Sequence, residues 1–155
     1  MLLLRRFNTG YEDGNYSLPA GHLDGAETVT AAMIREAQEE AGVVISRADL
    51  RVVHVMHRNV AGPGSSPRER VDFFLAAGRW QGSPGIGEPD KCDEVAWFPM
   101  TSLPGNVVPY VSAALHCYQR GESFSEFDWP EPARPGVSHS AGAGGQGGDT
   151  GAGRV

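Results

Sequence analysis

The chain has 155 residues, enough for about one domain with its own hydrophobic core. Hydrophobic residues make up 40% of the chain and charged residues 21%, as in ordinary globular proteins. The formal net charge of −6 argues against a broad contact with DNA or RNA, because phosphate backbones are bound by clustered Lys and Arg. A small phosphorylated substrate is compatible with this charge if a bound cation reverses the local sign.

The start of the chain predicts neither an export signal nor a membrane helix. Met1 is followed by three leucines, and Arg5 and Arg6 then end the apolar run. A signal peptide has a longer apolar run, and a membrane helix needs about 20 apolar residues. Cys92 and Cys117 lack the spacing of a zinc or redox site, so we expect two reduced thiols. These features favour the cytoplasm and no membrane partner.

The first part of the chain predicts two short extended segments and a helix. Residues 2–4 predict a strand, and residues 16–18 a short extended piece. Residues 26–41 predict a helix, with Gly42 placed to end it. The apolar side chains that recur there at helical spacing are Met33, Ile34, Ala37 and Ala41.

The middle of the chain predicts four more strands and a second helix. The strands are expected at residues 43–45, 50–56, 70–77 and 95–98. We expect the second and third of these to pair antiparallel around the loop 62–67. The helix is expected at 107–119, with an apolar face formed by Val108, Val111, Ala114, Leu115 and Tyr118.

The composition changes near residue 131. Residues 131–155 are dominated by Gly, Ala, Ser and Pro, which cannot offset the entropy cost of ordering. We therefore expect one domain at 1–130 and a disordered tail at 131–155. The order of strands, helix, strands and helix predicts a mixed α/β domain with a helix on each side of a sheet.

The first predicted helix carries three carboxylates on one side. At about 100° per residue, Glu36 and Glu40 lie about 40° apart around the axis, and Glu39 lies about 60° from Glu36. A charged run is more often a solvated helix face. However, like charges four residues apart destabilise a helix by roughly 0.2–0.5 kcal/mol per pair, and only Arg35 is near. A hard divalent cation would turn this cost into a binding site.

Residues 21–43 resemble the Nudix box, Gly-x5-Glu-x7-Arg-Glu-U-x-Glu-Glu-x-Gly-U, where U is apolar. The fixed positions are Gly21, Glu27, Arg35, Glu36, Glu39, Glu40 and Gly42, with Ala37 and Val43 at the apolar positions. Seven fixed residues at a background frequency of roughly 0.06 match by chance about 10⁻⁹ times per starting position. Segments 8–22 and 88–94 resemble a MutT-like branch of the superfamily, and the resemblance covers residues 2–120.

The resemblance implies roles for the box residues. Glu36, Glu39 and Glu40 would bind Mg²⁺ or Mn²⁺ directly or through water, and the carbonyl of Ala20 would add an oxygen ligand. Arg35 would orient the carboxylates, and Glu39 and Glu40 would act in catalysis.

Three further box residues have structural roles by this resemblance. Glu27 would accept a hydrogen bond or ion pair that shapes the loop, or simply meet the helix dipole. Gly21 and Gly42 would be needed for backbone shape.

A general base outside the box is also implied, and its position varies in the family. We favour Glu88, in the polar loop before the strand at 95–98, with Glu94 as the rival and Asp90 and Asp93 behind it. A single acid in such a loop can equally be a solvated residue.

The sequence contains few indications of which residues select the substrate. Aromatic side chains could stack on a base, although aromatics in strands are more often core; they are Phe73, Phe74, Trp80 and Trp97. Arginines could meet phosphates, although each alone is more often a surface charge; they are Arg5, Arg6 and Arg58.

The fold implied is an α/β/α sandwich around a mixed β-sheet, without the additional strand that usually precedes the one expected at 2–4. The activity implied is metal-dependent hydrolysis of a phosphoanhydride bond in a nucleoside diphosphate linked to a group X. A nucleoside triphosphate is the first expectation, and ADP-ribose, a dinucleotide or a nucleotide sugar the alternative. The partner is then a small-molecule nucleotide, not a nucleic-acid polymer, and the chain could form a homodimer.

Two alternatives belong to other functional classes. A non-catalytic nucleotide-sensing module of the same fold would not need Arg35 and the three glutamates of the helix. An isomerase of isoprenoid diphosphates would need further Cys and Glu residues placed for protonating a double bond.

Overall fold

The computed structural model describes residues 1–60 and 68–129. The elements found there are β1 (Leu2–Arg6), β2 (Tyr16–Ser17), α1 (Val29–Ala41), β3 (Leu50–Asn59), β4 (Glu69–Ala77), β5 (Cys92–Trp97), α2 (Pro109–Gln119) and β6 (Phe124–Phe127). A turn of 3₁₀-helix, η1 (Arg47–Asp49), precedes β3. The loop 62–67 and the expected tail at 131–155 lie outside the described residues.

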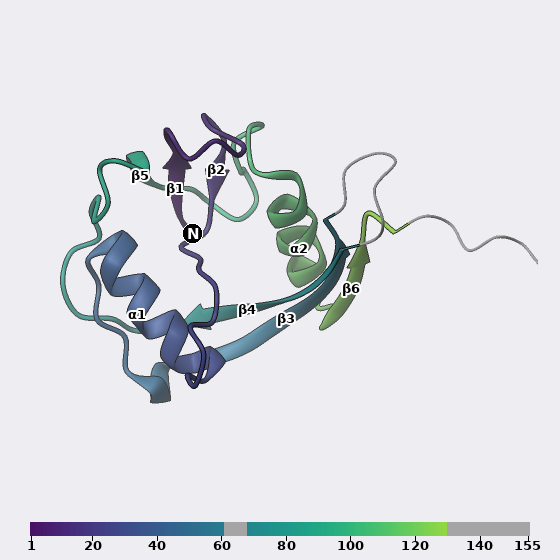
Figure 1. Cartoon of the computed structure of the whole chain (residues 1–155), viewed down its shortest axis with the longest axis horizontal. Helices are drawn as coiled ribbons and strands as arrows, with labels where there is room; N and C mark the ends of the chain where they lie inside the picture. Colours follow the sequence, from purple (N-terminus) through teal and green to yellow (C-terminus); the bar gives the residue numbers. More distant parts are fainter. Residues whose placement is uncertain (61–67, 130–155) are drawn as a thin grey trace, which may run out of the picture.

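The strands form two three-stranded sheets (Figure 1). In the first sheet, β1 is central and pairs antiparallel with β2 and β5, so that Leu3 lies opposite Ala96. In the second sheet, β3 is central, β4 is antiparallel to it and β6 is parallel to it. The expected pairing of β3 with β4 is confirmed, with Met56 opposite Asp72.

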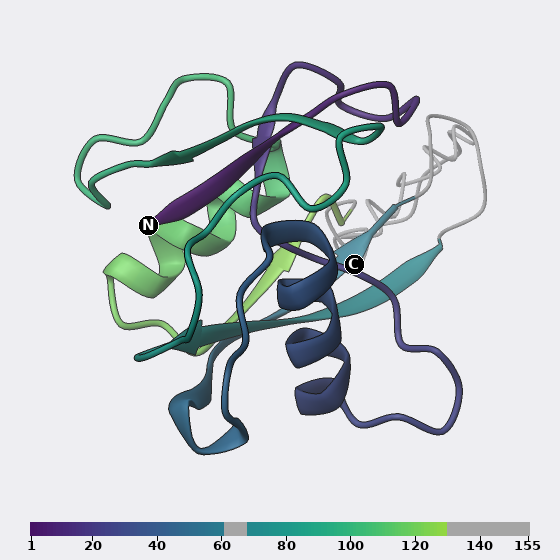
Figure 2. The same ribbon diagram turned by 90° about the vertical axis from the view of Figure 1, so that its left-hand side faces the viewer.

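The mixed α/β fold class is confirmed, with two differences in detail. The strands divide into two sheets, and the second of these is the mixed one. The strand β6 was not predicted, because Phe124 and Phe127 are three residues apart and do not show the alternation of period two that marks a half-buried strand. Figures 1 and 2 show α1 and α2 on opposite sides of the molecule.

Helix α1 begins three residues later than expected. Ala26 has a positive φ of 72°, and the Thr28 side chain accepts a hydrogen bond from the N–H of Ala31, which is an N-cap. At the other end Gly42 adopts the left-handed conformation, with φ 69°, and stops the helix as expected. Since both ends are set locally, the box helix is fixed in length by its own sequence.

Each helix packs on its own part of the core. In α1 the buried residues are Ala32, Ala37 and Ala41, and Ala37 and Ala41 pack with Val43 and Ile45. In α2, Val111 and Leu115 pack on Leu3 of β1. Pro109 occupies the first turn of α2, where its missing N–H costs nothing.

The prediction of a strand at residues 43–45 is wrong. Only Val44 forms a bridge there, with Gln81, whereas Val43 and Ile45 are buried under α1. The apolar run reflects burial on one helix, and it is too short to pair with a neighbouring strand.

Candidate active site

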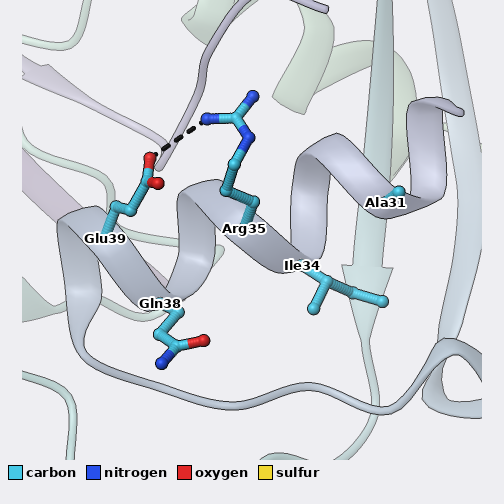
Figure 3. Close-up of a pocket in the computed structure, with 5 residues that line it drawn as sticks. All are labelled: Ala31, Ile34, Arg35, Gln38 and Glu39. Atoms are coloured by element: carbon cyan, nitrogen blue, oxygen red, sulfur yellow. Dashed lines mark hydrogen bonds and ion pairs between the residues drawn. The ribbon is translucent and has the colours of Figure 1, made fainter. Parts of the chain in front are cut away.

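The guanidinium of Arg35 gathers three carboxylates of the box. Its Nη2 donates to Oε1 of Glu27 at 2.8 Å. Its Nη1 donates to Oε1 of Glu36 at 2.7 Å and to Oε2 of Glu39 at 3.0 Å. Figure 3 shows the Arg35–Glu39 pair on one side of α1. Arg35 therefore ties the loop before α1 to the acidic side of the helix and relieves the repulsion among its glutamates.

Glu27 shapes the loop that precedes α1. It accepts a hydrogen bond from Arg35 and another from the N–H of Asp24 at 2.8 Å. The bond from Arg35 and then that from Asp24 lower the pKa of the Glu27 carboxyl. These contacts suit the structural role that the resemblance implies for this residue.

The carboxylate of Glu36 lies against the chain at Gly21. A Cβ atom at position 21 would overlap this carboxylate, so only glycine lets the loop pass so close. The Glu36 side chain is 13% exposed. The glycine at the start of the box is thus required by the packing of one of its glutamates.

The pKa of Glu40 in α1 is strongly raised. Its Oε2 accepts a hydrogen bond from the N–H of Ala20 at 2.8 Å. Burial raises the pKa of Glu40 to about 7; the bond from Ala20 opposes this shift, and the charges of Glu36 and Glu88 add to it. Three acids therefore lie near one another where a positive charge would be stabilising.

The loop after β4 lies on the C-terminal end of α1. The N–H of Gly85 donates to the carbonyl of Ala41 at 3.1 Å, and that of Gly87 to the carbonyl of Glu40 at 2.9 Å. A Cβ atom at Gly87 would overlap the backbone carbonyl of Glu39. This close approach carries Glu88 to the box, although 48 residues of sequence separate it from Glu40.

The other acids of this region have different partners. Arg5 binds Asp93 at 2.7 Å and Glu94 at 2.9 Å. Asp90 is exposed. Glu88 instead accepts a hydrogen bond from Nζ of Lys91 at 2.8 Å, a contact that the sequence did not suggest. The charge of Glu88 is near enough to Glu40 to add to the raised pKa of that residue.

The three arginines considered for phosphate contacts differ in their surroundings. Arg5 forms ion pairs with Asp93 and Glu94. Arg6 donates to the carbonyl of Tyr11 at 2.7 Å and so holds the β1–β2 loop. Arg58 is buried, 8% exposed, which corrects its interpretation as a surface charge. It is paired with Asp72 of β4, a residue that no pattern in the sequence singled out.

The expectation that the strand aromatics belong to the core holds for one of the four. Phe74 is partly buried beside His54, with ring centroids 5.8 Å apart. Phe73 is 46% exposed, and Trp80 and Trp97 are stacked on each other while 42% and 56% exposed. Exposure could not be predicted, because it depends on how the two sheets face each other.

A cavity of about 1360 Å³ lies between the sheets and the helices. Glu36, Glu40 and Glu88 line it, as do Arg58 and Asp72. A small molecule bound there can therefore meet both the box carboxylates and the second sheet. The shallow hollow of Figure 3 is formed by α1 alone, on the side that carries Ile34 and Gln38.

The donor atoms at this end of the cavity suit a hard divalent cation. Glu36 and Glu40 offer carboxylate oxygens, and a cation would relieve the repulsion that Glu40 experiences. Within residues 1–60 and 68–129, no group of three His, Cys, Asp or Glu side chains is already gathered for a metal. Mg²⁺ commonly takes one or two protein carboxylates and completes its shell with water and substrate phosphates, so the residues present fit it.

Comparison with known families identifies the chain. The model of the NUDIX domain family matches residues 1–118. The chain belongs to the Nudix family. The box at residues 21–43 and the loop that carries Glu88 both lie within the matched region, so the protein is a Nudix hydrolase whose substrate is a small-molecule nucleotide.

Individual relatives agree with this assignment. The Nudix chain is 29% identical over 121 residues to Phosphatase NudJ of Escherichia coli (strain K12), covering 74% of this chain and 76% of that protein. It is 30% identical to the MutT NUDIX hydrolase from Burkholderia pseudomallei, with a TM-score of 0.65 over 74% of this chain and 84% of the other. The MutT protein from Methanosarcina mazei Go1, 17% identical, shares the fold with a TM-score of 0.60 over 77% and 82% of the two chains.

A helix must be long and apolar to span a membrane. Within residues 1–60 and 68–129, no helix is both long and apolar enough to cross a bilayer.

Proposed function

We propose that this Nudix hydrolase uses Mg²⁺ or Mn²⁺ to cleave a phosphoanhydride bond of a nucleoside diphosphate linked to a group X, and that nucleoside triphosphates are its substrates. The observation that carries the proposal is the placement of Glu88 beside Glu36 and Glu40 in one cavity. One set of carboxylates can then hold a cation while another acid accepts a proton.

Glu36 and Glu40 are the proposed principal metal ligands, with Glu39 and the carbonyl of Ala20 completing the protein's share. A bound divalent cation neutralises the phosphates of the substrate and makes a water molecule more acidic. Arg35 keeps Glu36 and Glu39 in place through its two Nη1 hydrogen bonds. Carboxylates fixed in this way would hold the cation in one place, and the cation would orient the reacting phosphate for in-line attack.

Glu88 is the proposed general base. Its carboxylate would take a proton from the attacking water, and the leaving phosphate would depart on the opposite side of the phosphorus atom. Lys91 fixes the Glu88 side chain from 2.8 Å and brings a positive charge to the edge of the site. The docking of Gly85 and Gly87 on α1 keeps this base in reach.

The preference for nucleoside triphosphates is supported by the MutT-like sequence around the box. The structure from Burkholderia pseudomallei, named a MutT NUDIX hydrolase, resembles the chain in both sequence and fold. NudJ is named a phosphatase, which is compatible with removal of phosphate groups from a nucleotide.

The test is hydrolysis of a nucleotide panel with and without Mg²⁺, comparing the wild type with Glu40→Gln. The panel holds ordinary and oxidised nucleoside triphosphates, ADP-ribose, NADH, dinucleoside polyphosphates and nucleotide sugars. We expect metal-dependent turnover of triphosphates that Glu40→Gln loses by at least about a hundredfold. Turnover of ADP-ribose or a nucleotide sugar alone would contradict the substrate class. Nucleotide binding by folded protein, without turnover of any compound, would indicate a sensing module.

A further inference from the structure

A buried ion pair lies in the second sheet, away from the box. Arg58 of β3 donates from Nε to Oδ2 of Asp72 on β4, and from Nη2 to Oδ1 at 3.4 Å. Both residues line the cavity that also contains Glu36 and Glu40. Burying an ion pair costs free energy, and the proposed reaction does not use this one. The pair is therefore a candidate for another role.

Two tyrosines from different elements flank this pair. The guanidinium of Arg58 lies over the ring of Tyr110, 3.8 Å from its centroid, at the start of α2. Tyr11 comes from the β1–β2 loop and is 51% exposed. Burial raises the pKa of Tyr110, and Tyr11 is near enough to add a smaller effect of the same sign. Both tyrosines line the cavity.

The position of Tyr11 is fixed by the chain around it. Arg6 donates to the Tyr11 carbonyl at 2.7 Å and to Oγ1 of Thr9 at 2.9 Å, and its guanidinium lies 5.4 Å from the centre of the Tyr11 ring. Asp13 accepts hydrogen bonds from the N–H groups of Thr9 and Gly10. These contacts hold the loop against the cavity, although the Tyr11 ring is half exposed.

The charge of this cluster indicates what it can bind. Arg58 is already neutralised by Asp72, so the pair has little net charge to offer a phosphate group. It does present N–H donors and carboxylate acceptors side by side, and the half-exposed ring of Tyr11 offers a flat face. A neutral planar ring with donors and acceptors on one edge fits these features, and a nucleobase is such a ring.

We propose that Arg58 and Asp72 bind the hydrogen-bonding edge of the substrate's nucleobase, while Tyr11 contacts its face and Tyr110 supports the Arg58 guanidinium. Asp72 accepts an N–H of the base, and Arg58 donates to the acceptor atom beside it. This inference rests on the proposed function, since it takes the substrate to be a nucleotide whose phosphates lie at the box glutamates. The box then sets the reaction, and the second sheet selects the base.

Binding of nucleoside monophosphates, measured by calorimetry without metal, tests the inference independently of turnover. The probes are GMP, AMP, the 5′-monophosphate of unsubstituted purine riboside, which lacks N–H donors on its base, and ribose 5-phosphate. We expect the wild type to bind GMP or AMP at least about tenfold more tightly than the purine analogue, because the base of the analogue has no N–H to donate to Asp72. Ribose 5-phosphate should bind more weakly still.

Two variants separate base binding from folding. In Asp72→Asn, Arg58 retains the amide oxygen and turns the NH₂ group toward the base, so the preference over the purine analogue should fall at least about fivefold. Tyr11→Ala, on an exposed loop, should weaken AMP about tenfold and leave ribose 5-phosphate unchanged. Phe124→Ala removes an aromatic side chain of similar exposure outside the cavity and should leave all four affinities unchanged.

Equal affinity of the wild type for AMP and ribose 5-phosphate would overturn the inference. So would a full preference over the purine analogue in Asp72→Asn that unfolds at the wild-type temperature. Should Asp72→Asn fail to fold, Tyr11→Ala decides. Base-selective binding without triphosphate hydrolysis would contradict only the proposed function, whereas hydrolysis without base-selective binding would contradict only this inference.

Discussion

The carboxyl of Glu40 is largely withdrawn from water, and burial raises its pKa to about 7, with the charges of Glu36 and Glu88 adding to the shift. A glutamate in an unfolded chain titrates near pH 4.3. Between about pH 4 and pH 7 the folded chain therefore binds more protons than the unfolded one. By linkage, the free energy of unfolding decreases as the pH rises through this window. Glu40, a proposed metal ligand, thus destabilises the metal-free fold at neutral pH.

Replacing Glu40 with glutamine should reveal this cost. Gln cannot ionise but can still accept the hydrogen bond from Ala20, so Glu40→Gln should melt a few degrees above the wild type at pH 8 without metal, and show no gain near pH 4. Thermal unfolding at both pH values measures this. Mg²⁺ should raise the melting temperature of the wild type at pH 8 and leave that of the variant nearly unchanged. A variant less stable at both pH values would show that Glu40 is held by favourable contacts and not strained by burial.

Glu88 and Glu94 permit a matched comparison of two acids from one segment. Glu88→Gln should lower kcat by roughly a hundredfold or more, because the amide cannot take a proton from water. Glu94→Gln should change kcat by less than about threefold, since Glu94 is occupied by Arg5 at 2.9 Å. Steady-state kinetics on the best substrate, with melting temperatures as a folding control, decide between them. Equal losses in the two variants would remove Glu88 from its assigned role.

At the scale of elements, the contact between the loop after β4 and the end of α1 assembles the site. Helix α1 supplies carboxylates from about one and a half turns of sequence, whereas the proposed general base, Glu88, comes from a different segment. The loop and the helix are joined by two backbone hydrogen bonds, from the N–H of Gly85 to the carbonyl of Ala41 and from the N–H of Gly87 to the carbonyl of Glu40. Their contact also depends on the missing side chain at Gly87, where the loop touches the helix backbone.

A methyl group at Gly87 should therefore separate the loop from the helix. Gly87→Ala places its Cβ on the carbonyl of Glu39, which cannot move without disturbing α1, so Glu88 must shift. We expect kcat to fall by about 10- to 100-fold, because a displacement of about 1 Å is enough to misplace a catalytic group. Gly105→Ala is the control, since its Cβ would meet nothing within 4 Å. Full activity in Gly87→Ala would show that the loop can move without loss of function.

At the scale of the whole molecule, two small sheets and two helices surround a cavity whose two ends differ. The acidic end is formed by α1 and the loop after β4. The other is formed by β3, β4, the β1–β2 loop and the start of α2. Because different elements build the two ends, we expect substitutions at the second end to alter substrate choice without altering the reaction proposed at the box.

The composition of the C-terminal segment gives a prediction about the extent of the functional unit. A chain that ends at residue 130 should keep kcat within about twofold and its melting temperature within about 2 °C, since residues 131–155 have few apolar groups to bury. A chain that ends at residue 128 should be less stable. It loses Trp129, whose Nε1 donates to the carbonyl of His57 at 3.1 Å and whose ring lies on that histidine. Loss of activity in the longer of these two chains would assign a role to the tail.

The sequence by itself determined the parts of the protein that depend on short-range order. The box residues are neighbours along one helix, so their spacing alone placed Glu36, Glu39 and Glu40 on one side with Arg35 among them. The N-cap at Thr28 and the left-handed Gly42 are likewise local, and only the first turn of α1 was misplaced. The main strands followed from their apolar patterns.

Tertiary structure decided everything that joins distant segments. Pairing with β3 makes residues 124–127 a strand, and burial under α1 turns the apolar run at 43–45 into core. Arg58 appeared to be a surface charge until Asp72 and Tyr110 were found beside it. Likewise, the sequence favoured Glu88 among four loop acids, but only the contact of Gly85 and Gly87 with α1 explains how it comes close to the box. Such contacts depend on the closure of long loops around a shared core, and no local pattern of residues encodes which segments will meet.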